Sequence, residues 1–380
     1  MSRDRPEPIT VTHIISGDLW AGAEVQVYNL CKGLLASHEV VPTAVVFNEG
    51  FLSDRLRALG MEVDVASEKE LSAVQIVFAI ARHCRKHGSQ VVHTHGFKEN
   101  ILGILGKDIA GVPRSVRTVH GNPETNFAPT QLHKRITHYL DTLLGRLRQR
   151  HVIAVSSQLE ERLQPLFPGK VKKIFNFVDV EAIQRSKTLK ADTGSHPFKL
   201  GIVGRLVAVK RVDLFLETVA LLNKKGIDCT GVIIGTGPLE PALKKLAKDL
   251  EIDHLVEFRG FRDPVHDELQ QLDALIMPSD HEGLPMTLLE ALALEIPIIA
   301  HDTGGIPEIL KAGECGWIVC DHSANGYAEK TLEVTQCSLK KRSEKSQRGL
   351  EHVRTYFGMK ENMHRYLNIY CTTSKEQGSL

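Results

Sequence analysis

The feature that most constrains this chain is a twofold alternation of short apolar segments with longer segments of helical periodicity. The first series of predicted strands comprises Ile9–Ile15, Val40–Phe47, Glu62–Val65, Gln90–His95, Ser115–Val119, His151–Val155 and Val171–Phe175. The second comprises Phe198–Val203, Thr230–Ile234, His254–Phe258, Leu272–Met277, Ile296–Ala300 and Gly316–Val319. Strands that alternate with helices predict parallel sheets with helices on both faces. The fold class is therefore α/β, with two Rossmann-like, doubly wound domains.

The length of 380 residues also favours two domains, because it exceeds what a single hydrophobic core usually holds. Residues 183–197 are polar and typical of a linker. We therefore expect an N-terminal domain over residues 1–182 and a C-terminal domain over residues 198–355. A helix over about 356–372 is expected to pack back onto the first domain. Two such domains usually bind a ligand in a cleft outside the carboxyl ends of their strands.

Composition excludes several classes of protein. The net charge of +1 argues neither for nor against a nucleic-acid partner, and we expect none. The seven cysteines follow no disulfide or zinc spacing. The first eight residues are charged and lack the apolar core of a signal peptide. No apolar run approaches the ~20 residues that are needed to span a bilayer. These features predict a cytoplasmic protein.

Two glutamates bracket the predicted start of a helix in the second series. Glu282 lies in the loop that precedes the helix, Pro285 suits its first turn, and Glu290 is expected about two turns inside it. The free N–H groups and the positive dipole end of such a helix favour phosphate. A carboxylate at Glu290 would then reach sugar hydroxyls beside that phosphate.

Cations are expected at the same edge of the second sheet. Gly204 and Arg205 end its first strand, and Lys210 follows five residues after Arg205. Such cations are placed to bind a diphosphate, although a solvated basic loop is the alternative. In the first series the Gly17–Glu24 loop joins a strand to a helix. Its backbone is therefore able to approach a phosphate or a sugar closely. The alternative is a turn without a ligand, because many strand–helix turns carry glycine.

The histidines suggest hydrogen bonding rather than a metal. His93 and His95 flank Thr94, and His120 lies between a predicted strand and Gly121. No carboxylate or cysteine joins these histidines at a recognisable spacing. We expect His93 and His95 to be structural and His120 to hydrogen-bond a ligand. No Asp-x-Asp pair for a divalent metal is present either. We therefore expect neither a metal nor a cofactor at the site.

A basic segment lies at 132–151, where Lys134, Arg135, Arg146, Arg148 and Arg150 stand against one acid, Asp141. Leucine and isoleucine are interleaved with these charges. A basic amphipathic helix of this kind is able to lie on an anionic membrane surface, and the alternative is a solvated helix face.

These residues carry a resemblance to a known family. The Glu282–Glu290 spacing resembles the Glu-x7-Glu signature of retaining glycosyltransferases with the GT-B fold, and the chain is similar to family 4, the "group 1" glycosyltransferases. The segments that carry the resemblance are Ala21–Glu24, Asn176–Asp179, Gly204–Leu206 with Lys210, Gly235–Pro238, Phe258–Phe261, Pro278–Pro285 and Asp302–Glu308. Together they extend over roughly residues 9 to 320.

The resemblance implies roles for individual residues. Arg205 and Lys210 would stabilise the charge that grows on a departing diphosphate, in place of a metal. Glu282 would contact the transferred sugar and His120 would hydrogen-bond it. These four residues form the expected catalytic set, and Glu282 is not expected to be a glycosidase-type nucleophile.

The resemblance also implies a donor-binding set. Glu290 would bind the donor ribose, and the backbone at Thr287 and Leu288 would hold phosphate. The remaining members are backbone positions close to the donor: Gly17, Gly22, Gly204, Gly260 and Phe261. Two residues depart from the family pattern. Ala21 replaces a glycine, which is a mild change if its φ is negative. Phe177 replaces another glycine and is expected to narrow the cleft or contact the acceptor.

The resulting hypothesis is a retaining, metal-independent, hexosyl-type glycosyltransferase that moves a sugar from a UDP-sugar, or less favourably a GDP-sugar, to an acceptor hydroxyl. The expected setting is bacterial polysaccharide or lipopolysaccharide synthesis, with a glycan or lipid-linked glycan acceptor and a possible peripheral contact at the inner membrane face. One alternative is a GT-B-fold sugar-nucleotide epimerase or hydrolase, which would act on the donor alone. Another is a non-catalytic nucleotide-sugar binding protein, against which the intact charged set argues.

Overall fold

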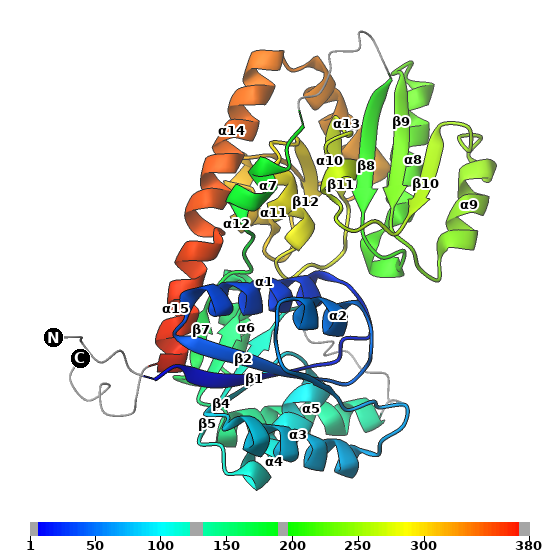
Figure 1. Ribbon diagram of the computed structural model, residues 1–380. Helices are drawn as coiled ribbons and strands as arrows, with labels where there is room; N and C mark the ends of the chain where they lie inside the picture. Colours follow the sequence, from blue (N-terminus) through cyan, green and yellow to red (C-terminus); the bar gives the residue numbers. More distant parts are fainter. Residues whose placement is uncertain (1–6, 122–131, 189–196, 372–380) are drawn as a thin grey trace, which may run out of the picture. The chain divides into compact units, whose positions relative to one another are not determined.

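The computed structural model describes residues 7–121, 132–188 and 197–371 and resolves into two compact units (Figure 1). The first unit ends at Phe177 and resumes at Met359, and the second extends from Val178 to Gly358. The chain thus crosses between units at Phe177–Val178, just before α7 (Val180–Arg185), which packs against α11 (Met286–Ala293) of the second unit. Of the proposed linker, residues 189–196 lie outside the described residues.

The first unit contains a seven-stranded parallel sheet in the order β3-β2-β1-β4-β5-β6-β7. Its strands are β1 (Ile9–Ile15), β2 (Val40–Val46), β3 (Val63–Val65), β4 (Val91–Thr94), β5 (Arg114–Val119), β6 (His151–Ala154) and β7 (Val171–Lys173). Its helices are α1 (Gly22–Ser37), α2 (Phe51–Ala58), α3 (Ala73–His87), α4 (Phe97–Ala110), α5 (Leu132–Arg148), α6 (Ser157–Leu163) and α15 (Met359–Cys371). The central strands are buried because helices cover both faces of the sheet, as the alternation predicts.

The second unit contains a six-stranded parallel sheet in the order β10-β9-β8-β11-β12-β13. Its strands are β8 (Phe198–Val203), β9 (Cys229–Ile234), β10 (Val256–Gly260), β11 (Ala274–Met277), β12 (Ile298–His301) and β13 (Trp317–Val319). Its other helices are α8 (Val212–Lys224), α9 (Glu240–Asp249), α10 (His266–Leu269), α12 (Ile306–Ile309), α13 (Ala324–Gln336) and α14 (Leu339–Tyr356), with short 3₁₀ turns at Ala208–Lys210 and Lys311–Gly313. Both sheets therefore have the Rossmann strand order.

Helix α15 belongs to the first unit and lies beside α1 (Figure 1). Its buried side chains Met363, Tyr366 and Tyr370 complete the core formed by β1, β4 and α1. Phe177 is fully buried in the same core, with its ring 6.2 Å from that of Tyr366. The expectation that Phe177 narrows a cleft or contacts an acceptor is therefore wrong, because its side chain packs beneath α15 inside this unit.

No described helix is both long and apolar enough to cross a membrane.

Candidate functional site

Some of the predicted site residues follow the strands at which the order of each sheet reverses. In the second unit, Gly204 follows β8 and Ser279 follows shortly after the neighbouring strand β11. In the first unit, Gly17 follows β1 and His95 follows the neighbouring strand β4. Connections from these strand pairs leave in opposite directions and open a crevice at the carboxyl ends, which is where doubly wound folds bind ligands.

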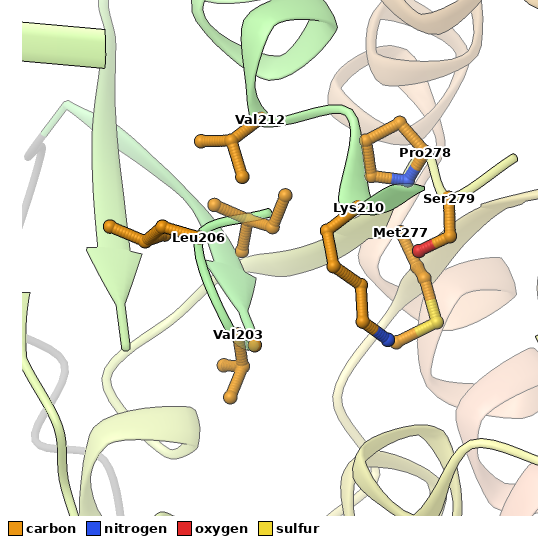
Figure 2. Close-up of a pocket in the computed structure, with 9 residues that line it drawn as sticks. Val203, Leu206, Lys210, Val212, Met277, Pro278 and Ser279 are labelled. Carbon is orange, nitrogen blue, oxygen red and sulfur yellow. The ribbon is translucent and has the colours of Figure 1, made fainter. Parts of the chain in front are cut away.

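Lys210 and Glu282 form an ion pair in the second unit. The Lys210 Nζ donates to Glu282 Oε1 at 2.5 Å, and the side chains are 26% and 9% exposed. Lys210 extends along a small hollow that is also lined by Met277 and Ser279 (Figure 2). Arg205 is exposed, and within the described part of the chain its guanidinium has no ion-pair partner. The segments that follow β8 and β11 therefore present the cations of Lys210 and Arg205 and the carboxylate of Glu282.

The loop that carries Glu282 is held by backbone hydrogen bonds on both sides. Asp280 N donates to Val209 O at 2.9 Å, and Gly305 N donates to Gly283 O at 2.8 Å. Gly304 has φ +59°, and a Cβ at this position would lie 1.8 Å from the Glu282 carbonyl oxygen. This close approach requires glycine and explains why the Asp302–Gly305 segment accompanies the Glu282 loop.

An ionic cluster around Asp280 was not recognised from the sequence. Its Oδ1 accepts hydrogen bonds from Arg211 Nη1 at 3.2 Å and His322 Nε2 at 3.0 Å. Burial alone would raise the pKa of Asp280, but the bonds from His322 and Arg211 leave it lowered. The His322 ring stacks on that of His301 with centroids 3.7 Å apart. His322 lies 42 residues from Asp280, so no local motif signals this contact.

The predicted helix is present as α11, which begins at Met286, but Pro285 is its extended N-cap residue rather than part of its first turn. The first N–H groups of a helix lack intrahelical partners, so the backbone near Thr287 is available to an anion. Leu288 N, in contrast, donates to Pro285 O at 3.2 Å. Glu290 is the fifth residue of the helix and so lies little more than one turn inside it rather than two.

The Glu290 carboxylate faces His266 of α10, with Oε1 3.7 Å from the imidazole Nε2. Burial lowers the pKa of His266, but the adjacent Glu290 outweighs this effect and leaves it raised. The carboxylate form of Glu290 has two acceptor oxygens, which suit two hydroxyl hydrogen bonds.

Glycines bring three loops of the second unit together. Gly235 N donates to Gly260 O at 2.8 Å, and a Cβ on Gly235 would lie 1.9 Å from Gly204 O. Gly260 adopts φ +68°, and the following Phe261 side chain is 39% exposed. The predicted donor-binding residues Gly204, Gly260 and Phe261 thus share one loop cluster, although no described contact assigns them a ligand.

In the first unit, the loop after β1 has the close backbone approach that its glycines suggest. Gly17 has φ +74°, and a Cβ there would lie 3.3 Å from Asn48 O. Gly22 is the first residue of α1, and the N-cap residue Ala21 has φ −133°, so alanine is tolerated there. Glu24 Oε2 accepts from Ala21 N at 3.2 Å. Burial raises the pKa of Glu24 to about 7.

His120 is the partly buried end of a row of three imidazoles, of which His13 and His95 are buried. His95 Nδ1 lies 3.1 Å from His120 Nε2, and His95 Nε2 lies 3.1 Å from His13 Nδ1. Burial lowers the pKa of His13 to about 3 and that of His120 to about 4, so these rings are neutral near pH 7. Since each bond then needs one N–H and one bare nitrogen, the tautomers of the three rings are linked. His120 Nδ1 is buried without a hydrogen-bond partner.

His13, His93 and His95 each have a ring nitrogen within 4.8 Å of the others, which is close enough to consider a metal. Both nitrogens of His93 are hydrogen-bonded, Nδ1 to Tyr370 Oη at 2.6 Å and Nε2 to Thr118 Oγ1 at 2.8 Å. The group contains no anionic ligand and is fully buried, which opposes a divalent charge. These contacts favour the structural role expected for His93 and His95.

Two units with Rossmann strand order define the GT-B class of α/β protein, and solved structures share this fold. HepE from Anabaena, in complex with UDP and glucose, superposes with a TM-score of 0.83 at 16% identity and covers 96% of this chain and 100% of that one. A glycosyltransferase from Rickettsia africae gives a TM-score of 0.77 at 18% identity, covering 96% and 98%.

Family models match most of the chain. "Glycosyltransferase Family 4" matches residues 20–182 and "Glycosyl transferases group 1" matches residues 186–352. This protein belongs to the group 1 glycosyltransferase family.

Two similar proteins match over different lengths. The putative colanic acid biosynthesis glycosyltransferase WcaL of Salmonella typhimurium is 31% identical over 37% of this chain, and the match spans 36% of that relative's length. An Escherichia coli UDP-Gal:α-D-GlcNAc-diphosphoundecaprenol α-1,3-galactosyltransferase is 25% identical over 75% of this chain and 76% of its own.

Proposed function

We propose that this protein transfers a hexosyl-type sugar from a nucleotide-sugar, with UDP preferred to GDP as the nucleotide, to an acceptor hydroxyl in bacterial cell-surface polysaccharide synthesis. The anomeric configuration is retained and no metal is needed. The proposal rests mainly on the Lys210–Glu282 pair beside the exposed Arg205, at the carboxyl edge where β8 and β11 meet. Cations that bind a diphosphate, together with a neighbouring carboxylate that contacts the sugar, suit cleavage of the bond between sugar and phosphate.

The proposed chemistry needs no protein nucleophile. The bond between the anomeric carbon and the phosphate oxygen breaks, and the acceptor oxygen bonds to that carbon from the same face. The acceptor proton passes to the departing phosphate, and Lys210 and Arg205 stabilise the charge that collects there. Glu282 and His120 hydrogen-bond the sugar, and Glu290 binds the ribose hydroxyls.

The printed descriptions of similar proteins support the choice of donor. HepE has been solved in complexes with UDP and with UDP-glucose, and the Escherichia coli relative is described as using UDP-Gal. The glycan and diphosphoundecaprenol in that description support a glycan or lipid-linked glycan acceptor.

A ligand screen followed by a transfer assay tests the function. The melting temperature of the full chain would be measured with UDP, GDP, ADP and their sugars, since a bound ligand stabilises the native state. We expect stabilisation by uridine nucleotides, and α-linked product only when an acceptor is added. Donor isomerisation or hydrolysis alone would favour the epimerase or hydrolase alternative, and stabilisation by no nucleotide would overturn the proposal. Full activity after chelation would support metal independence.

Helix α5 supports a lipid-linked acceptor at the cytoplasmic membrane face. Its side chains at helical spacing form an exposed apolar row made of Ile136, Tyr139, Leu140, Leu143 and Leu147. Arg135, Arg146 and Arg148 are exposed on the same helix. We propose that apolar insertion and attraction to anionic lipid act together here.

Flotation with liposomes tests this contact. The wild-type chain should float with vesicles of anionic lipid and less with neutral ones. The double variant Tyr139→Ser, Leu147→Ser, or charge reversal at Arg146, Arg148 and Arg150, should abolish flotation. Charge reversal at the exposed Lys245 of α9 is the matched control. Binding that the α5 variants leave unchanged would disprove the proposal.

A further inference from the structure

A second group of possible metal ligands lies at the edge of the first sheet, separate from the residues proposed for transfer. Asp64 is on the edge strand β3, and His83 and His87 are one turn apart on α3. One carboxylate oxygen and one nitrogen from each ring lie within 4.8 Å of one another. The spacing of four residues places both imidazoles on one face of the helix, as in helical zinc motifs.

His83 is already oriented by contacts on both ring nitrogens. Its Nδ1 lies 2.8 Å from Asp64 Oδ2, and its Nε2 lies 3.1 Å from Thr43 Oγ1. Thr43 Oγ1 is in turn 2.9 Å from Thr12 Oγ1. An imidazole whose far nitrogen is fixed by a hydrogen bond is the usual arrangement of a metal-ligating histidine. The ring therefore presents Nδ1 toward Asp64 in a defined direction.

His87 supplies the second, independent observation. Its ring centroid lies 4.4 Å from that of His83, and its Nε2 is buried without a hydrogen-bond partner in the structure. A buried imidazole nitrogen that lacks a partner loses hydration without compensation. A metal ion beside Asp64 and His83 that also ligates the His87 ring would compensate for this loss.

The chemistry of this group differs from that of the buried His13, His93 and His95 group. Asp64 contributes a negative charge, and its side chain is 44% exposed, so an ion and its water can enter from solvent. A zinc ion with bonds of about 2 Å holds its ligand atoms roughly 3.3 Å apart. The 2.8 Å contact would open to this distance, and the other ligand atoms already lie within 4.8 Å of one another.

We propose that Asp64, His83 and His87 bind a divalent transition-metal ion of the zinc class, with water completing the coordination. Two imidazoles and one carboxylate suit Zn²⁺ and its neighbours and disfavour Mg²⁺ or Ca²⁺. Helix α3 runs back toward the amino ends of the strands, so His87 in its last turn lies away from the carboxyl edge. The ion joins the edge strand β3 to α3 and has no part in sugar transfer.

Titration of the untagged full chain with Co²⁺, and then with Zn²⁺, tests the proposal. We expect one equivalent of Co²⁺ to develop visible d–d absorption, and Zn²⁺ to displace it and raise the melting temperature. Asp64→Asn keeps the size of the side chain and His87→Ala is compatible with the last turn of a helix, so both variants should fold. Each should weaken binding of Zn²⁺ at least about tenfold.

The exposed His254 provides a matched control, since His254→Ala removes an imidazole from the other unit and should leave binding unchanged. Failure of the wild type to bind a stoichiometric ion overturns the site. Unchanged affinity for Zn²⁺ in either Asp64→Asn or His87→Ala overturns the three-ligand set. Such a result would also be obtained if the ion were bound by His13, His93 and His95 instead. None of these measurements depends on glycosyl transfer, so the site stands or fails independently of the proposed function.

Discussion

The Lys210 ammonium and the Glu282 carboxylate lie 2.5 Å apart although 72 residues separate them in the chain. The segments that carry them follow β8 and β11, which are neighbours in the second sheet. The pairing holds Lys210 in place before a substrate arrives. When a diphosphate enters, we expect the ammonium to exchange Glu282 for phosphate oxygens, which frees the carboxylate for the sugar.

Lys210→Ala should reduce kcat/KM for transfer roughly 10²-fold or more, because it removes a preorganised charge from the departing diphosphate. Lys244→Ala is a matched control, since Lys244 is half-exposed on α9 and pairs only with Glu240 among the described carboxylates. Steady-state kinetics with both variants checks the prediction. A Lys210→Ala enzyme with near-wild-type kcat/KM would contradict the site assignment.

Glu290→Ala should also reduce transfer roughly 10²-fold, here through loss of donor binding. Glu290→Gln provides a readout that does not depend on activity. Because the Glu290 carboxylate raises the pKa of His266, the amide should lower this pKa. An NMR titration of the His266 ring measures the shift, and an unchanged pKa would show that the two side chains do not interact in solution.

Gly304→Ala should disturb the Glu282 loop, because its Cβ would lie 1.8 Å from the Glu282 carbonyl oxygen. Gly313→Ala is the matched control: Gly313 also has positive φ, +96°, but no atom lies within 4 Å of its Cβ position. Both variants should lose about 1 kcal/mol of stability from backbone strain, but only Gly304→Ala should lose the thermal shift caused by nucleotide. Equal shifts in the two variants would count against the described loop geometry.

Acid should destabilise the first unit between pH 6.5 and about 4. Burial lowers the pKa of His13 to about 3 and of His120 to about 4 from 6.5, so the unfolded chain binds protons that the native state excludes. Each group then removes about 1.4 kcal/mol from the free energy of unfolding per pH unit in this window. Urea unfolding at several pH values checks this, and constant stability from pH 6.5 to 5 would contradict it.

Glu24 should oppose this acid effect. Its pKa is raised to about 7 by burial, so the native carboxyl takes up a proton below pH 7 that the unfolded chain does not hold until about pH 4.5. Glu24→Gln removes this contribution but retains an acceptor for the Ala21 N–H. The variant should therefore lose stability more steeply than wild type between pH 7 and 4.5, as urea midpoints would show. An equal slope would contradict the raised pKa.

Tyr366→Ala should cost about 3–5 kcal/mol of stability, because the ring is fully buried in the core that α15 completes. Tyr356→Ala at the end of α14 is the control, since that side chain is 51% exposed, and it should cost much less. Equilibrium unfolding measures both. Similar losses would imply that α15 does not pack against the first unit in solution.

The sequence predicts the elements well and the side-chain partners poorly. Strands β1 and β8 have the predicted bounds, Ile9–Ile15 and Phe198–Val203. Apolar periodicity and caps are local, so they are visible in one dimension. The burial of Phe177 is not predictable from local sequence, because its ring packs near Tyr366, which is on a helix almost at the other end of the chain.

The sequence by itself determined the α/β class, the two Rossmann-like series, and the identity of the charged residues and the glycines at the ends of their strands. Only the tertiary structure decided which of them meet: Lys210 with Glu282, Glu290 with His266, and His120 with His95 and His13. The physical reason is that strand order places carboxyl ends side by side without regard to separation in the chain. Burial then sets the protonation state of the titratable groups, and their positions in the sequence do not reveal how deeply they are buried.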